Sequence, residues 1–229
     1  MQAVAMLVYK DLVQQRSRLL VGCAILVIFS LNLAMGGEGG IGSIGGVLGG
    51  LIMVTTLGTA YEEDQGGLIY LRSLPLSARD ITAGKFLSTL SFAFLFTASG
   101  LLPVLLLTNS SQTWQALVPG VVAAASSGLL LSGFLLAVFF RHGYRSIRLY
   151  LMYFSLVPIG LALGWQVLQN SGLVRDAGQS TQQQGWLHTL AAWSAVSTWR
   201  PVMLTLMITA TLYLLLLQLA TRNLQHRDL

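Results

Sequence analysis

The chain has 229 residues, of which only 9% are charged and 54% are hydrophobic. Soluble domains average about 25% charged residues, so this composition excludes an ordinary soluble domain and an extended disordered chain, and it favours a protein that exposes apolar surface to lipid. The single cysteine, Cys23, excludes a disulfide framework or a cysteine metal site within one chain, and the net charge of +5 is dispersed between apolar runs, which is not the pattern of a nucleic-acid-binding protein.

Residues 1–18 are too polar to cross a membrane, and their pattern predicts an interfacial helix. Three apolar residues recur at every fourth position on one side of this helix, and the opposite side would be polar: Val4, Val8 and Leu12 against Lys10, Asp11, Gln14, Gln15 and Arg18. Arg16 belongs to the same expected helix. The alternative is a frayed N-terminal tail.

Six uncharged apolar runs follow, each long enough to cross a hydrocarbon core of about 30 Å as a helix. The chain is therefore predicted to be an all-α, polytopic membrane protein, with one transmembrane domain over 1–229 and spans at 19–35, 41–60, 86–107, 117–140, 149–168 and 202–220. The first run would otherwise be a signal peptide, but signal sequences have shorter apolar cores and another apolar run follows at once.

The basic residues predict the orientation of these spans. One side of the predicted topology carries 11 of the 13 Lys and Arg residues, namely Lys10, Arg16, Arg18, Arg72, Arg79, Lys85, Arg141, Arg145, Arg148, Arg222 and Arg227. The other side carries only Arg175 and Arg200. Because short cytoplasmic loops are enriched in Lys and Arg, both termini are expected in the cytoplasm.

Glycines recur at every fourth position of the second expected span, at Gly42, Gly46 and Gly50, with Gly45 and Gly49 on the adjacent row. Small residues at this spacing let two helix backbones approach closely in lipid. The stripe therefore predicts either helix packing within the chain or a contact between two subunits.

The sequence offers no catalytic, cofactor or metal site. The pair Gly84-Lys85 is followed by Phe86, and position 79 is Arg, so the nucleotide-binding pattern G-x-x-x-x-G-K-[ST] is not met. All three histidines fall outside the expected spans, and the spans contain no Asp, Glu, Lys or Arg. This argues against an intramembrane protease and weakens, without excluding, a self-contained secondary carrier. A structural or sensor membrane protein is a third possibility.

The expected cytoplasmic loop 61–85 is the most informative segment. It begins with an acidic cluster, Glu62, Glu63 and Asp64, and continues with apolar residues that would form a short amphipathic helix. Ser77 is placed to cap a second helix that starts at Ala78, with Asp80 in its first turn. These features predict a docking surface, with a solvated connector as the alternative.

The loop motif resembles that of the permease subunits of ABC type-two exporters. The similarity comprises Glu62-Glu63, then Gly67-Leu68-x-x-Leu71-x-x-Leu74-Pro75-x-Ser77, and Gly84-Lys85 before the third span, together with the opening Tyr9-Lys10-Asp11-Leu12 and Arg16. The opening is similar to that of small, half-size members such as peptide and bacteriocin exporters. The chain departs from larger members in having no large outer domain. A haem-exporter membrane subunit of cytochrome c maturation is the alternative within this architecture.

The resemblance implies a partner and a site. A separate ATPase subunit, in two copies, would carry ATP and Mg, and a second permease chain, identical or homologous, would complete the exporter in a bacterial inner membrane. The coupling region would comprise Glu62, Glu63, Asp64, Leu68, Leu71, Arg72, Leu74 and Pro75, and the interfacial helix would carry Lys10, Asp11 and Arg16. Because the expected pathway contains no charge, the substrate would be amphiphilic or apolar, such as a peptide, lipid or drug.

Overall fold

The computed structural model describes residues 2–34, 41–63, 76–107, 111–147, 150 and 199–227. All of the long elements in these ranges are helices, namely α1 (Gln2–Gln14), α2 (Arg16–Ala34), α3 (Ile41–Glu62), α5 (Ala78–Leu107), α6 (Ser111–His142) and α10 (Trp199–Arg227). The expected all-α class is therefore confirmed for the described part of the chain. The expected coupling helix lies outside it.

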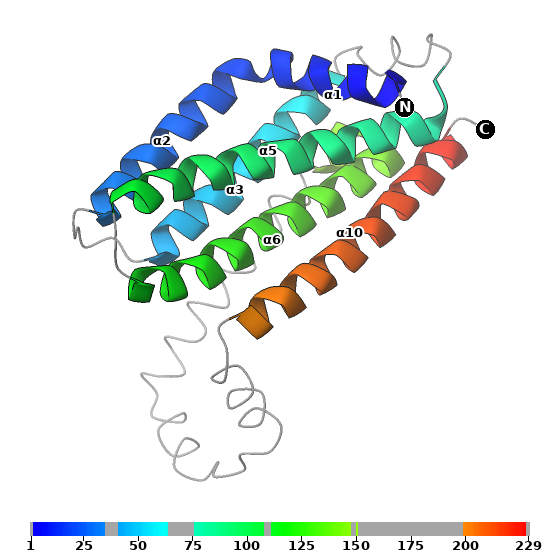
Figure 1. Cartoon of the computed structure of the whole chain (residues 1–229). Coiled ribbons are helices and arrows are strands. Elements are labelled where there is room, and N and C mark those ends of the chain that lie inside the picture. The colour runs from blue at the N-terminus through cyan, green and yellow to red at the C-terminus, as the bar shows by residue number, and fades with distance from the viewer. Residues whose placement is uncertain are drawn as a thin grey trace, which may run out of the picture.

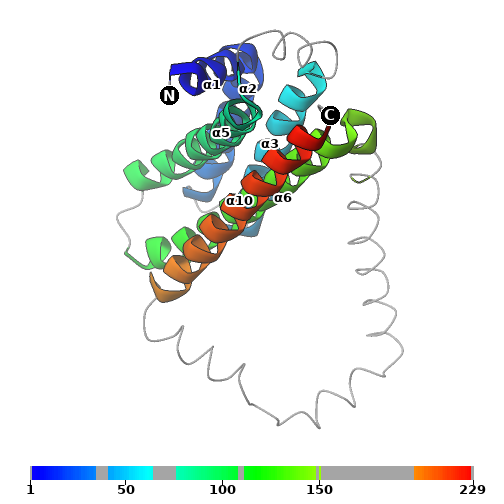
Figure 2. The ribbon, with the colours of Figure 1, turned by 90° about the vertical axis from the view of Figure 1, so that its right-hand side faces the viewer.

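The described helices form a bundle whose two chain ends lie close to the same end (Figure 1). Helix α2 lies along α5, while α3 and α10 both lie along α6. Figure 2 shows the same arrangement from the side, with α1 turned across the end of the bundle. The chain therefore runs back and forth along one axis, as the predicted membrane topology requires.

Two adjacent apolar clusters hold the bundle together. One lies at the end that carries both termini and joins five helices, through residues that include Leu7, Ala60, Phe86, Phe140 and Leu224. The other lies farther along the bundle, through residues that include Leu26, Ile52, Phe96 and Val121. Large apolar side chains also cover the outside of the bundle, among them Leu20, Ile28, Phe94, Leu106, Met207 and Leu214. An apolar exterior of this kind suits contact with lipid.

Three of the helical stretches are long and apolar enough to cross a membrane, namely Ala78–Val104, Val118–His142 and Val202–His226. The bent pair Ala3–Gln14 and Arg16–Asn32 would make a fourth. The expected second span falls on α3, and the expected fifth span, 149–168, lies almost entirely outside the described residues. The structure thus supports a multi-pass membrane protein, and the number six stays a prediction.

The chain bends by 67° between α1 and α2, at Gln15. The Gln15 side chain is buried and accepts a hydrogen bond of 2.7 Å from the Arg18 guanidinium. That guanidinium lies over Gly58 of α3, where a Cβ atom would overlap it. The expected helix over 1–18 therefore ends at Gln14, and Arg16 begins α2 instead of lying on the interfacial helix.

Candidate functional site

A buried charge cluster, formed by Asp11, Glu63 and Lys85, lies where α1, the end of α3 and α5 meet. The Lys85 ammonium donates hydrogen bonds to both carboxylate oxygens of Asp11, at 2.7 and 2.9 Å. It also lies 2.5 Å from Oε1 of Glu63. The three side chains are at most 3% exposed. The structure thus brings together three motif fragments that are far apart in the sequence.

One face of α5 is built to receive α1 at this point. Gly84 leaves room for Leu7, since a Cβ atom at Gly84 would lie only 3.0 Å from the Leu7 side chain. Lys85 follows directly, and Ser88 lies one turn later with its hydroxyl 2.8 Å from Oδ2 of Asp11 and 2.9 Å from the Gly84 carbonyl oxygen. The close approach at Gly84 therefore lets a side chain of α1 reach the Lys85 ammonium.

The two carboxylates are held differently. Asp11 has two hydrogen bonds from Lys85 and a hydroxyl within reach, whereas neither Glu63 oxygen receives a hydrogen bond of good geometry within the described part of the chain. Glu63 is instead balanced by charge, with Lys85 beside it and the Lys10 ammonium 3.8 Å from Oε1. Burial raises the pKa of the Glu63 carboxyl, and the Lys85 ammonium opposes this rise. Glu63 is therefore the less firmly held member of the cluster.

The charge cluster borders segment 64–75, which lies outside the described residues. Glu63 immediately precedes this segment, and the helix that carries Lys85 begins shortly after it. The start of that helix is fixed by a capping box: the Ser77 hydroxyl oxygen accepts a hydrogen bond from the Asp80 amide at 3.1 Å, and the Asp80 carboxylate accepts one from the Ser77 amide at 3.2 Å. The sequence prediction of a cap at Ser77 and a helix from Ala78 is confirmed.

Three expectations about exposure were wrong. Asp11 and Gln15 are expected on the polar side of the first helix, but both are buried, whereas Met6 and Tyr9 on α1 are 73% and 70% exposed. Glu63 was expected in an exposed acidic surface and is 2% exposed. The reason is common to the two carboxylates: Lys85, which the sequence places in the expected loop 61–85, is buried and offers both of them a counter-charge.

Only some of the other expected site residues lie in the part of the chain that the structure describes. Lys10 lies beside the charge cluster and Glu62 is half-buried. The remaining coupling residues, Asp64, Leu68, Leu71, Arg72, Leu74 and Pro75, lie outside the described residues. Lys85 is the residue that the sequence analysis does not name as a site residue, although it stands inside the quoted motif; its ammonium group contacts both Asp11 and Glu63.

Gly49, on the row adjacent to the expected glycine stripe, packs against another helix of the chain. Gly49 of α3 meets Gly128 of α6 so closely that a Cβ atom at Gly128 would lie 3.0 Å from the Gly49 Cα. Gly46 and Gly50 have open space where a Cβ atom would be, and the Gly42 position falls where side-chain surroundings are not described. The Gly46 and Gly50 row therefore faces away from the rest of the described chain.

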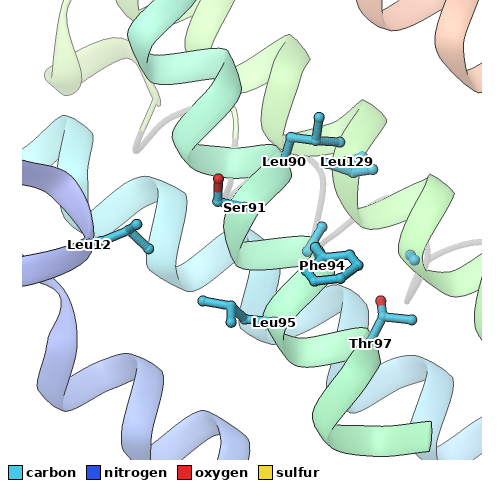
Figure 3. A pocket seen from close by; sticks show the side chains of 9 residues that line it. Leu12, Leu90, Ser91, Phe94, Leu95, Thr97 and Leu129 are labelled. Carbon is cyan, nitrogen blue, oxygen red and sulfur yellow. The ribbon is translucent and has the colours of Figure 1, made fainter. Parts of the chain in front are cut away.

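An apolar groove of about 600 Å³ runs along α5, beside α1 and α6 (Figure 3). Leu12, Leu90, Phe94, Leu95 and Leu129 are among its lining residues. Ser91 also lines it, but its hydroxyl donates to the Leu87 carbonyl oxygen at 2.9 Å. The groove therefore has the chemistry to hold an apolar chain. Within the described residues, no group of His, Cys, Asp and Glu side chains is arranged to hold a metal ion.

Comparison with known proteins gives one match. A family model described as ABC-2 family transporter protein matches residues 6–222, which is most of the chain. No curated protein and no solved structure matches. The matched range includes all three members of the charge cluster and the whole of the segment between Glu63 and Ser77.

Proposed function

The chain belongs to the ABC-2 family of transporter proteins and is a membrane subunit without a catalytic ATPase domain, and we propose that it couples ATP hydrolysis on a separate subunit to export. Two copies of that ATPase, carrying ATP and Mg, would bind below a pair of permease chains. Residues 61–85 would form the contact. The charge cluster is the observation that carries this proposal, because it fastens the start of that loop to the helices that would move.

The coupling step follows from the contacts. Movement of the ATPase would displace segment 64–75, whose ends continue directly into α3 and α5. Lys85 joins α5 to α3 through Glu63 and to α1 through Asp11, so a push on the loop would reach three helices together. A loop attached by flexible ends would absorb the same push. Alternating exposure of a site between two permease chains would result.

The proposed substrate is amphiphilic or apolar, such as a peptide, lipid or drug. The apolar groove along α5 supports this choice, since nearly all its lining residues are apolar. A bare ion would need polar groups to replace its water, and the groove offers few. We place the chain in a bacterial inner membrane with both termini cytoplasmic, because 11 of 13 basic residues lie on that side of the predicted topology.

A second permease chain, identical or homologous, would complete the transporter. The row of Gly46 and Gly50 supports a subunit contact on this face of α3, since it is open in the single chain while its neighbour Gly49 is already used against α6. Small residues on a lipid-facing helix permit close approach of a second helix.

The test is transport-linked ATPase activity in the reconstituted complex of this chain with its ATPase subunit. Leu71→Asp should uncouple hydrolysis from transport, because burying a Leu side chain in a partner contributes about 1.5–3 kcal/mol. Gln65→Asp is the matched control, since it adds the same charge to the same loop at a position that is already polar. If the Leu71→Asp protein retains the ATPase subunit and still couples ATP hydrolysis fully to transport, the loop is only a connector and the proposal is wrong.

A second pair of variants separates the loop surface from its attachment. Glu63→Gln should reduce coupling more than Glu62→Gln, because Glu63 contacts the Lys85 ammonium and Glu62 has no ion pair among the described residues. Equal effects of the two substitutions would show that the Glu63–Lys85 contact has no special part in coupling and that both carboxylates contribute only to the charge of the loop surface.

A further inference from the structure

A second groove, of about 720 Å³, lies between the beginning of α5 and the end of α10. A hydrogen bond of 2.8 Å between the Thr82 and Thr221 hydroxyls joins the two helices beside it. Arg79 lies one turn before Thr82, and Arg222 directly follows Thr221, so each helix contributes one arginine to the lining of the groove. The charge cluster does not contribute to this groove.

The groove carries an excess of positive charge. Both Arg79 and Arg222 are exposed, and neither forms an ion pair with another described residue. Asp80 is the acidic residue that lines the groove, and its carboxylate is engaged by the Ser77 amide and hydroxyl, at 3.2 and 2.6 Å. Two guanidinium groups from different helices, with the nearby carboxylate already hydrogen-bonded, favour a bound anion.

The groove continues into an apolar surface along α10. Leu214, Leu217 and Arg222 lie on the same side of this helix and all line the groove. Eight residues at a rise of 1.5 Å place Leu214 about 12 Å from Arg222 along the axis. Leu214 is 58% exposed on a helix that is apolar and long enough to cross a membrane. One face of α10 therefore leads from a charged end to hydrocarbon-facing leucines.

We propose that Arg79 and Arg222 hold the phosphate headgroup of an anionic phospholipid, with one acyl chain lying along Leu214 and Leu217. Basic pockets between membrane helices at the cytoplasmic side are suited to anionic headgroups, and these arginines lie on the side that the basic-residue count assigns to the cytoplasm. A free phosphate would use the arginines and not the leucines. A protein partner would approach from the aqueous end, whereas this groove extends toward the membrane-facing side of α10.

The experiment measures lipid binding by native mass spectrometry of the full chain released from detergent, titrated with phosphatidylglycerol or phosphatidylcholine. Phosphatidylglycerol should bind and phosphatidylcholine should not compete with it. Each basic residue near a membrane surface contributes about fivefold in affinity, so Arg79→Gln/Arg222→Gln should weaken phosphatidylglycerol binding roughly 30-fold. Arg141→Gln/Arg145→Gln is the matched control, because it removes two exposed arginines from the same side of the predicted topology, and it should change binding less than about twofold.

Four results would overturn the proposal. Equal phosphatidylglycerol binding in the two double variants would show that the arginines do not form the site. Complete competition by glycerol phosphate against phosphatidylglycerol would show that the groove binds a free anion and not a lipid. The Arg79→Gln/Arg222→Gln variant could also lose its ATPase subunit in phosphatidylcholine while its affinity for phosphatidylglycerol stays unchanged. That result would identify the groove as a protein-docking surface. Arg79→Lys/Arg222→Lys keeps both charges, so it should retain most of the binding, and a loss equal to that of the Gln variant would show that positive charge at these positions does not hold the lipid.

Discussion

Replacement of Lys85 by Met removes the buried ammonium group and keeps an unbranched side chain in its place. Two carboxylates would then remain buried without their main counter-charge, since Asp11 and Glu63 are each 2% exposed. Removing one partner of a buried ion pair costs about 3–5 kcal/mol. For a chain of this length, each kcal/mol of lost stability lowers the melting temperature by about 2–4 °C, so Lys85→Met should lower it by roughly 6–20 °C.

The single cysteine supplies the assay. Cys23 is partly buried on α2, so its reaction with a thiol-specific fluorescent dye reports unfolding of the detergent-solubilised chain on heating. Lys10→Met is the control, because Lys10 approaches the same Glu63 oxygen at 3.8 Å but is 37% exposed. An exposed pair contributes about 0–1 kcal/mol, which corresponds to about 0–4 °C.

A neutral cluster distinguishes lost charge balance from lost packing. The triple variant Asp11→Asn/Glu63→Gln/Lys85→Met carries no charge at the three positions, so it should recover much of the melting temperature that Lys85→Met loses. The reasoning is refuted if Lys85→Met shifts the melting temperature no more than Lys10→Met does. It is also refuted if the triple variant is no more stable than Lys85→Met, because the cost would then not arise from uncompensated charge.

Two further predictions concern topology and the start of α5. A reporter that is active only in the cytoplasm should be active when fused after Leu229 and inactive when inserted near Gln183, and the reverse pattern would contradict the six-span topology. Ser77→Ala should lower the free energy of unfolding by about 0.5–2 kcal/mol in the thiol assay, since it removes the hydroxyl that caps the Asp80 amide. Ser91→Ala, which removes a hydroxyl bonded within its own helix, is the control and should change stability by less than 0.5 kcal/mol, on the order expected for a surface substitution.

Local features of the fold were predictable from the sequence. The beginning of α5 depends on residues three positions apart, Ser77 and Asp80, and the structure forms the expected cap there. The apolar runs likewise fall on helices wherever the chain is described, because a helix in lipid must satisfy its own backbone hydrogen bonds. Such features depend on neighbours in the sequence, which a reader of the sequence can see.

The charge cluster was not predictable in the same way. Asp11 and Lys85 are separated by 74 positions, and their contact requires the bend at Gln15 and the close approach of α1 at Gly84. Sequence periodicity places Asp11 on a polar face, and a polar face is ordinarily the wet one. The tertiary contact reverses that assignment, because the Lys85 ammonium supplies a counter-charge for the buried carboxylate.

The position of the cluster explains why a chain with few charges buries three of them together. Sliding α1 along α5 by one turn moves a side chain about 5.4 Å, which would take Asp11 beyond hydrogen-bond reach of Lys85 and leave the Asp11 carboxylate without its counter-charge. Leucines at the same places would tolerate such a shift. We therefore infer that the cluster fixes the register of α1 on α5 more than it adds stability. The triple neutral variant should then regain its melting temperature and still couple ATP hydrolysis to transport less tightly than the native chain. Native coupling in that variant would show that apolar packing alone sets the register.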